Sequence, residues 1–228
     1  MIGIITAMDE ETNEVKKIME NVEHTKIYDI DVFKGTISNK ECVLAKCGVG
    51  KVNAARTTQL LIEKNDLECI VNVGSAGALN KDLDYGDIVI SDKCLQHDFD
   101  ITAFGHEKGY ISGLGKYFEA DKKLVEKCDK ILNSMLEDGY KTVIGTVASG
   151  DKFQNDRLEK QKIYDEFSAD CVEMEGAAIA QTCQLSNVPF IIIRSITDKS
   201  NENEHVDFYE YLQMASKRCA DFIKEFVK

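Results

Sequence analysis

Residues 69–79 read CIVNVGSAGAL, a short apolar run followed by small residues. The length and β-branched content of 69–73 predict a buried strand, and the glycines after it predict a tight turn. Working outward, comparable runs occur at 2–6 (IGIIT), 87–92 (DIVISD), 142–148 and 189–196 (PFIIIRSI). Continuous apolar strands that alternate with helices predict a mostly parallel sheet covered on both faces.

Helical patterns separate these strands. They cover residues 9–20, 50–64, 120–136, 156–167, 176–185 and 208–227. Residues 25–37 and 41–47 indicate a meander of two or three strands, and 172–175 ends another short strand. The 228 residues contain one proline and no repeat or Pro/Ser-rich linker. We therefore expect a single α/β domain spanning 1–228.

Charge and hydropathy exclude several classes of partner. The formal net charge is −12, with 40 acidic against 28 basic residues, which disfavours binding to nucleic acid or to anionic membranes. The longest strongly apolar stretch, 188–193, is too short to span a bilayer. The N-terminus lacks the basic region of a signal peptide. We expect a cytoplasmic protein.

The eight cysteines form no C-x-x-C pair, and several lie inside apolar runs. This distribution predicts reduced, mostly buried thiols rather than a disulfide framework. No two of the four histidines have metal-ligand spacing, so we expect no metal site.

Acidic residues follow several predicted strands. Asp9, Glu10 and Glu11 follow the first, residues 173–175 (EME) follow a short one, and Asp198 follows 189–196. Acids in a first helical turn usually complement the helix dipole. However, several carboxylates at apolar strand ends cost desolvation free energy unless a site uses them. Because ligands bind beyond the carboxyl ends of such strands, we expect a site there.

Familiar nucleotide and hydrolase motifs are absent. The run CGVGKV (47–52) lacks the spacing of a nucleotide-triphosphate P-loop, and no G-x-G-x-x-G follows the first strand. There is no G-x-S-x-G elbow, and Ser149 has no histidine nearby in the sequence, so a serine hydrolase is disfavoured.

Eight motifs in order carry a family resemblance. They are GIITAMDEE, CGVGKVNAA, VNVGSAGAL, GDIVISD, HDFDITAFG, SGDKF, VEMEGAAIA and VPFIIIRSITD. Together they resemble the 5′-methylthioadenosine/S-adenosylhomocysteine nucleosidases of the nucleoside phosphorylase superfamily. The resemblance implies a twisted mixed central sheet flanked by helices, a homodimer, and no metal or organic cofactor. It also implies hydrolytic release of adenine from these two nucleosides and from 5′-deoxyadenosine.

The resemblance assigns the chemistry to residues at the strand ends. Glu11 would activate the attacking water, with Ser75 and Arg194 holding that water. Asp198 would protonate adenine N7. Two acidic groups on opposite faces of the sugar parallel the logic of glycoside hydrolysis.

The resemblance also implies a binding surface for base and sugar. Phe153 would stack on adenine, the backbone at Gln154 would address its edge, and Gly77 would allow close approach. Glu175 would bind the ribose hydroxyls, with Met174 packed beneath the sugar. Gln154 replaces a residue that is commonly aliphatic in the family.

A third group concerns the 5′ substituent. Phe208 would close the 5′ pocket, and Ile101 and Phe104 match positions that one subunit contributes to the pocket of the other. Thr197 replaces the usual serine before the acidic residue and is carried over as substrate-binding. The loop 109–115 lacks a proline often found at this pocket, which leaves the preferred 5′ substituent open.

Three alternatives remain at this stage. A phosphorylase of the same fold would need cationic phosphate contacts near the first strand, where Asp9, Glu10 and Glu11 instead repel phosphate. A hydrolase acting on aminodeoxyfutalosine shares these motifs. A receiver-like signalling module would end near about 120 residues and need a late lysine where Asp198 stands.

Overall fold

The computed structural model describes residues 1–135, 139–199 and 204–228, with the side chains of 204–210 outside that description. The strands are β1 (Ile2–Thr6), β2 (Glu20–Ile27), β3 (Ile30–Ile37), β4 (Lys40–Lys46), β5 (Cys69–Ala78), β6 (Ile88–Gln96), β7 (Phe118–Glu119), β8 (Thr142–Ser149), β9 (Cys171–Glu173) and β10 (Phe190–Asp198). The helices are α1 (Asp9–Lys17), α2 (Lys51–Lys64), the short 3₁₀ helix η1 (Thr102–Phe104), α3 (Lys122–Met135), α4 (Arg157–Phe167), α5 (Gly176–Leu185) and α6 (Glu204–Phe226).

All the strands belong to one mixed sheet. Its order is β10-β6-β8-β9-β5-β1-β4-β3-β2, with β7 paired to β6 and β10 paired also to β5. The strands β5, β10, β6, β8 and β9 therefore close into a ring, and β1 to β4 extend it. Half of the pairings are antiparallel, so the expectation of a mostly parallel sheet is wrong. The α/β class and the mixed central sheet are confirmed.

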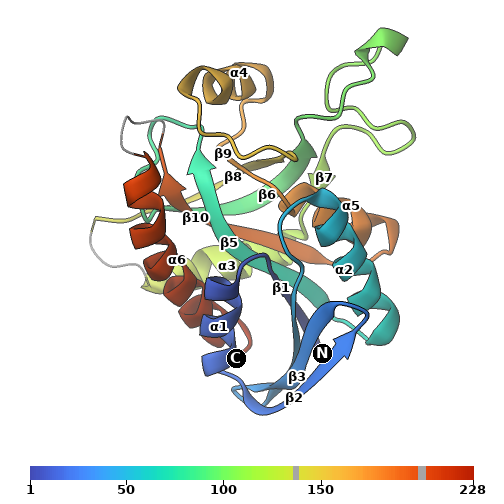
Figure 1. Cartoon of the computed structure of the whole chain (residues 1–228), viewed down its shortest axis with the longest axis vertical. Helices are drawn as coiled ribbons and strands as arrows, with labels where there is room; N and C mark the ends of the chain where they lie inside the picture. Colours follow the sequence, from blue (N-terminus) through green and yellow to red (C-terminus); the bar gives the residue numbers. More distant parts are fainter. Residues whose placement is uncertain (136–138, 200–203) are drawn as a thin grey trace.

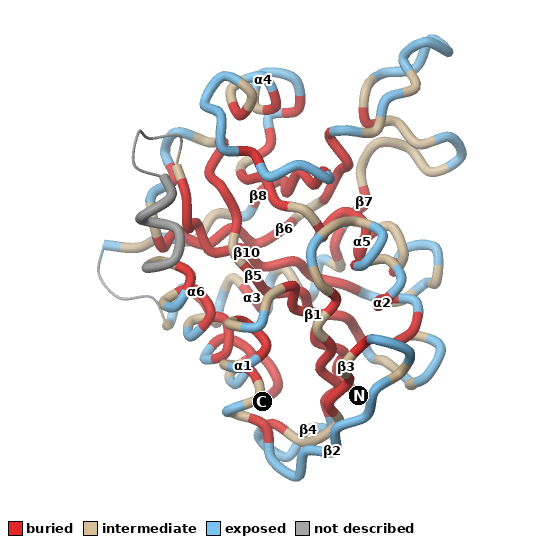
Figure 2. The backbone as a smooth tube through the Cα atoms, in the orientation of Figure 1, coloured by how far each residue is buried: buried red, intermediate tan, exposed pale blue. Residues whose placement is uncertain are grey.

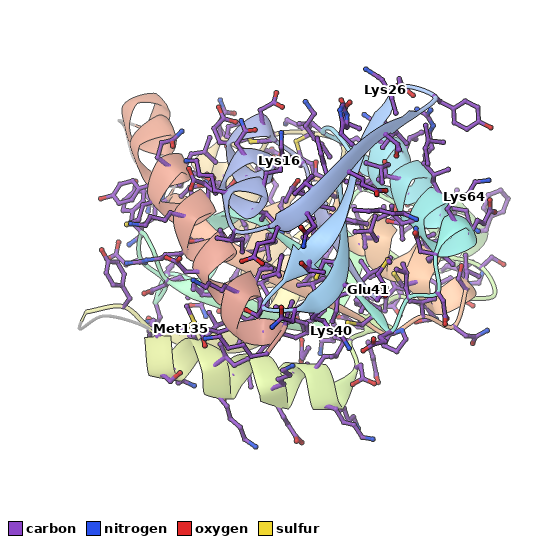
Figure 3. All side chains as sticks on the ribbon, turned by 90° about the horizontal axis from the view of Figure 1, so that it is seen from below. Lys16, Lys26, Lys40, Glu41, Lys64 and Met135 are labelled. Atoms are coloured by element: carbon purple, nitrogen blue, oxygen red, sulfur yellow. The ribbon has the colours of Figure 1, made fainter. Side chains whose placement is uncertain are left out.

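Helices cover the sheet from two sides. Figure 1 shows α1, α3 and α6 together on one side and α2 and α5 together on the other. The helix α4 lies apart, beside the ends of β5 and β9. In Figure 3, seen from the end that carries β2 and β3, the labelled lysines Lys16, Lys26, Lys40 and Lys64 are spread over α1, β2, β4 and α2.

The core lies on both faces of the central strands. Every residue of β1 and β10 is buried, and Figure 2 shows the buried backbone concentrated in the strands. The predicted apolar runs are therefore true core strands. All eight cysteines are free and buried, as expected. Within the described ranges, no helix combines the length and apolarity needed to cross a membrane.

The structure corrects several predicted boundaries. Residues 74–78 continue β5 instead of forming a tight turn, because neighbouring strands pair with them on both sides: Ser75 lies opposite Ser195, and Gly77 opposite Val172. The first helix ends at Lys17, not residue 20, because β2 begins there as an exposed polar edge strand. The last helix begins at Glu204, earlier than residue 208.

Candidate active site

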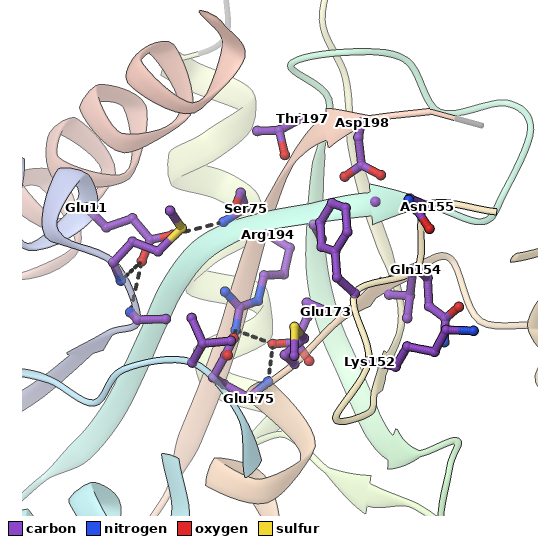
Figure 4. A pocket seen from close by; sticks show the side chains of 18 residues that line it. Glu11, Ser75, Lys152, Gln154, Asn155, Glu173, Glu175, Arg194, Thr197 and Asp198 are labelled. Carbon is purple, nitrogen blue, oxygen red and sulfur yellow. Dashed lines mark hydrogen bonds and ion pairs between the residues drawn. The ribbon is translucent and has the colours of Figure 1, made fainter. Parts of the chain in front are cut away.

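The strand ends surround one cavity of about 490 Å³. Figure 4 shows Glu11 at one end of it and Asp198 at the other, with Ser75 and Arg194 between them. The lining residues are Ala7, Met8, Glu11, Val49, Ser75, Ala76, Gly77, Lys152, Phe153, Gln154, Asn155, Val172, Glu173, Met174, Glu175, Arg194, Thr197 and Asp198. The structure thus brings together ten of the thirteen residues singled out in the sequence.

Glu11 turns back from the first turn of α1 toward the end of β1. Its Oε2 accepts hydrogen bonds from the backbone N–H groups of Ala7 (2.9 Å) and Met8 (3.1 Å), and its Oε1 from that of Ser75 (3.3 Å). The side chain is almost fully buried. Burial raises the pKa of Glu11, although Arg194 and these three N–H groups oppose the shift. A carboxylate with a raised pKa suits proton abstraction near neutral pH.

Its two acidic neighbours in the sequence do not enter the cavity. Asp9 is exposed and pairs with Lys46 at 2.6 Å, while Glu10 stays on the outer side of the helix. Their position in the first turn of α1 fits favourable interaction with the helix dipole. Of the three acids in this motif, only Glu11 has access to the cavity.

Arg194 occupies the centre of a buried polar network. Its Nη2 donates to Asn72 Oδ1 at 2.6 Å and to Glu173, and it lies 3.9 Å from Glu175 Oε2. A Cβ added at Gly74 would collide with Arg194 Nη1 and lie 3.0 Å from Glu11 Oε1, so Nη1 reaches toward Glu11 across that glycine. A buried guanidinium is tolerated here because carboxylates compensate its charge.

Glu173 anchors this network and was not assigned a role from the sequence. It accepts hydrogen bonds from Ser149 Oγ and from the backbone N–H groups of Glu175 (3.0 Å) and Gly176 (2.7 Å). The sequence signal for it was a glutamate directly after a buried run. Its bonds hold β9, the start of α5 and Arg194 in fixed relation.

Glu175 faces the middle of the cavity. Its Oε1 accepts from the backbone N–H of Gly50 at 2.8 Å, which connects it to the start of α2. Burial and, after it, the neighbouring Glu173 raise the pKa of Glu175 to about 7, although Arg194 opposes the shift. Such a carboxylate can accept hydrogen bonds from hydroxyl groups of a bound sugar.

Asp198 ends β10 and lies against two elements. Its Oδ2 is 2.6 Å from Nζ of Lys160, a lysine of α4 that is 2% exposed. A Cβ added at Gly77 would lie 2.7 Å from the same oxygen, so the absence of a side chain there leaves room for the carboxylate. Sequence reasoning missed Lys160, although its spacing from the buried Ile163 and Phe167 puts it on the apolar face of α4.

The segment between β8 and α4 forms the wall near Asp198. Gln154 is buried there and Phe153 is half-exposed. Thr197 contributes a buried hydroxyl that has no hydrogen-bond partner among the described residues. Met174 also lines the cavity, which combines apolar surface with a few polar atoms, as small-molecule sites do.

Three predicted residues do not line this cavity in the described structure. Ile101 and Phe104 lie at η1, in an excursion that projects away from the body of the molecule (Figure 1). Phe104 is 81% exposed. The side chain of Phe208 lies outside the part of the chain that the structure describes.

Comparisons with known proteins show the family of this chain. The family model of the phosphorylase superfamily matches residues 1–228. The 5′-methylthioadenosine/S-adenosylhomocysteine nucleosidase of Staphylococcus haemolyticus is 38% identical over 229 residues, covering 100% of this chain and 99% of the relative.

Solved structures give the same result. The nucleosidase of that name from Neisseria meningitidis, in complex with methylthio-immucillin-A, has a TM-score of 0.94 and 36% identity, covering 100% of this chain and 98% of the other. Futalosine hydrolase of Helicobacter pylori has a TM-score of 0.92 and 32% identity, with coverage of 99% and 96%. The resemblance found in the motifs is confirmed over the whole length, and the chain belongs to the phosphorylase superfamily.

Proposed function

We propose that this enzyme hydrolyses the N-glycosidic bond of 5′-methylthioadenosine and S-adenosylhomocysteine, and that of 5′-deoxyadenosine. The products are adenine and the 5-substituted ribose. One observation carries the proposal: Glu11 and Asp198, far apart in sequence and both buried, line opposite ends of one cavity. The names of the relatives support the choice of substrates.

The two carboxyl groups divide the reaction between them. As the C1′–N9 bond breaks, its electron pair passes into the purine and C1′ becomes oxocarbenium-like. Water bonds to C1′ and gives a proton to Glu11, whose raised pKa favours this transfer. Asp198 supplies the proton taken up by N7, so that adenine leaves neutral.

The remaining cavity residues hold the substrate. Glu175 accepts the ribose hydroxyls, Met174 packs beneath the sugar, and Phe153 stacks on the base, with the backbone of Gln154 at the base edge. Ser75 and Arg194 position the water beside Glu11, supported by the Ser75 N–H bond and by the approach of Nη1 across Gly74.

Hydrolysis is favoured over phosphorolysis by the charge of the cavity lining. Four acidic residues, Glu11, Glu173, Glu175 and Asp198, line the cavity against two basic ones, Lys152 and Arg194. An inorganic phosphate would meet net repulsion there. The test is adenine release in phosphate-free buffer: unimpaired turnover is expected, and strict dependence on added phosphate would overturn the assignment.

A second candidate substrate is aminodeoxyfutalosine. The full-length structural match to a futalosine hydrolase supports it. Cleavage of methylthioadenosine, adenosylhomocysteine, 5′-deoxyadenosine, aminodeoxyfutalosine and inosine should be compared without phosphate. We expect the adenine nucleosides with 5′-thio groups to be cleaved and inosine to be resistant.

We also propose that two copies form the working enzyme, in the cytoplasm. The exposed Phe104 and its neighbour Ile101 would enter the 5′ pocket of the second copy. Eight free cysteines support a reducing compartment. Sedimentation should give a dimer, and Phe104→Ala should raise KM for methylthioadenosine more than it alters kcat. A monomer with full activity would contradict this arrangement.

A further inference from the structure

A buried lysine stands behind Asp198, outside the cavity lining. Lys160 is 2% exposed, and its Nζ lies 2.6 Å from Asp198 Oδ2, which is also buried. Because Lys160 does not line the cavity, it acts on a bound substrate only through the residues it touches. Within the described chain, it is the hydrogen-bond partner of Asp198.

Packing alone does not account for a charge at this position. Lys160 shares one face of α4 with Ile163 and Phe167, which pack into a small apolar cluster. An aliphatic residue would fill that face without the several kcal/mol that desolvating an ammonium costs. Buried lysines are rare unless paired, so the feature to explain is the pairing with Asp198.

The pairing fixes the geometry of the carboxyl group. The torsion that rotates an aspartate carboxyl group is broad, so an unheld group samples many orientations. The ammonium of Lys160 binds Oδ2, and the backbone of Gly77 bounds the carboxyl group on another side. Oδ1 is then the oxygen that remains for the purine.

The same contact secures the base-side wall. Lys160 lies in the first turns of α4, directly after the segment carrying Phe153 and Gln154. Asp156 caps this helix through the backbone N–H groups of Leu158 and Glu159. The ion pair therefore attaches the segment that lines the base end to the end of β10.

We propose that Lys160 is a positioning residue for departure of the base: it orients Asp198 toward N7 and holds the base-side wall in place. This inference rests on the proposed function, in which Asp198 protonates the leaving purine. The inference predicts a difference between leaving groups. Loss of Lys160 should slow reactions whose leaving group needs a proton and should not slow those whose leaving group does not.

The experiment compares two leaving groups on one sugar. Methylthioadenosine needs a proton on the purine, whereas the 4-nitrophenyl 5-methylthio-β-ribofuranoside releases a stable nitrophenolate. We expect Lys160→Met to lower kcat for methylthioadenosine by about 10- to 100-fold, less than the roughly 10²- to 10⁴-fold of a full general-acid contribution because Asp198 itself remains. With the nitrophenyl substrate, kcat should stay within about threefold of wild type.

Two further variants keep the test decisive. Lys160→Arg retains a cation and should recover most of the lost adenine release. Lys162→Met removes an exposed lysine of the same helix, which forms an ion pair with Glu159, and should leave turnover of both substrates unaffected. Equal losses on both substrates with Lys160→Met, or no loss on methylthioadenosine, would overturn the inference. Failure of the wild type to release adenine from any adenine nucleoside would instead refute the proposed function.

Discussion

The two ends of the cavity hold the same chemical group in different ways. At the water end, neutral backbone N–H groups of Ala7, Met8 and Ser75 hold the Glu11 carboxylate. At the base end, an ammonium holds Asp198. The hydrogen bonds to Glu11 come from neutral groups, and burial raises its pKa against the opposing charge of Arg194, as a base requires. The two carboxyl groups are therefore held by different kinds of donor, and the proton that Asp198 gives to N7 must come from Oδ1, the oxygen that Lys160 does not bind.

The largest effect should come from the water end. Glu11→Gln keeps the shape but removes the proton acceptor, and kcat should fall by at least about 10²-fold. The fall should be the same for methylthioadenosine and for the nitrophenyl riboside, because both need activated water. Steady-state kinetics on both substrates measures this, with Glu10→Gln on the same helix as control. Near-normal turnover of Glu11→Gln would remove it from this role.

The base end should respond selectively. Asp198→Asn cannot give a proton to N7, so kcat for methylthioadenosine should fall by at least about 10²-fold. For the nitrophenyl substrate, kcat should fall by no more than about tenfold, because nitrophenolate leaves without a proton. If Asp198→Asn and Glu11→Gln gave identical losses on both substrates, the contrast between the two ends would be lost.

A third prediction concerns stability and the carboxylate between the two ends. The folded-state pKa of Glu175 is raised to about 7, above its ordinary value, so the folded chain binds this proton more tightly than the unfolded chain. The stabilisation of the folded state by protonated Glu175 is fully present below about pH 4.5 and is lost as the pH rises through about 7. The free energy of unfolding of Glu175→Gln, relative to that of wild type, should therefore increase by about 2 kcal/mol from pH 5 to pH 8.

Urea denaturation of both proteins at a series of pH values measures this change. Glu41→Gln, on an exposed part of β4, is the control and should follow the wild type. Parallel stability curves for Glu175→Gln and wild type would contradict the raised pKa. The same variant should raise KM for methylthioadenosine if Glu175 holds the ribose.

The sequence predicted the buried strands of the site and the two acidic residues at their ends. The run 189–196 is apolar on both faces, and the strand it predicts is buried throughout. The strands β1 and β10 both pair in parallel with β5, so their carboxyl ends lie at one edge. That arrangement is why acids at positions 11 and 198 share a cavity, as predicted from the strand ends.

What the sequence did not reveal depends on non-local packing. Glycine and serine at 74–77 have the composition of a turn, but pairing with β10 and β9 keeps them in a strand. Lys160 belongs to a highly charged helix, and its burial follows only from where α4 packs against the end of β10. The polar strand β2 has no apolar alternation to predict it.

The smallest effect on kcat is expected from alanine substitutions at two glycines of β5, one beneath each end of the cavity. A methyl group at Gly77 would lie 2.7 Å from Asp198 Oδ2 and must displace a carboxyl group that Lys160 holds. We expect Gly77→Ala to reduce kcat for methylthioadenosine by about tenfold and to affect the nitrophenyl riboside little.

Gly74→Ala is the matched variant at the other end of the same strand. Its methyl group would collide with Arg194 Nη1 and lie 3.0 Å from Glu11 Oε1, so both substrates should be slowed together. Thermal unfolding of the two variants separates a local displacement from general destabilisation of β5. If the two alanine variants gave the same ratio of rates on the two substrates, the carboxylates at the two ends would not act independently.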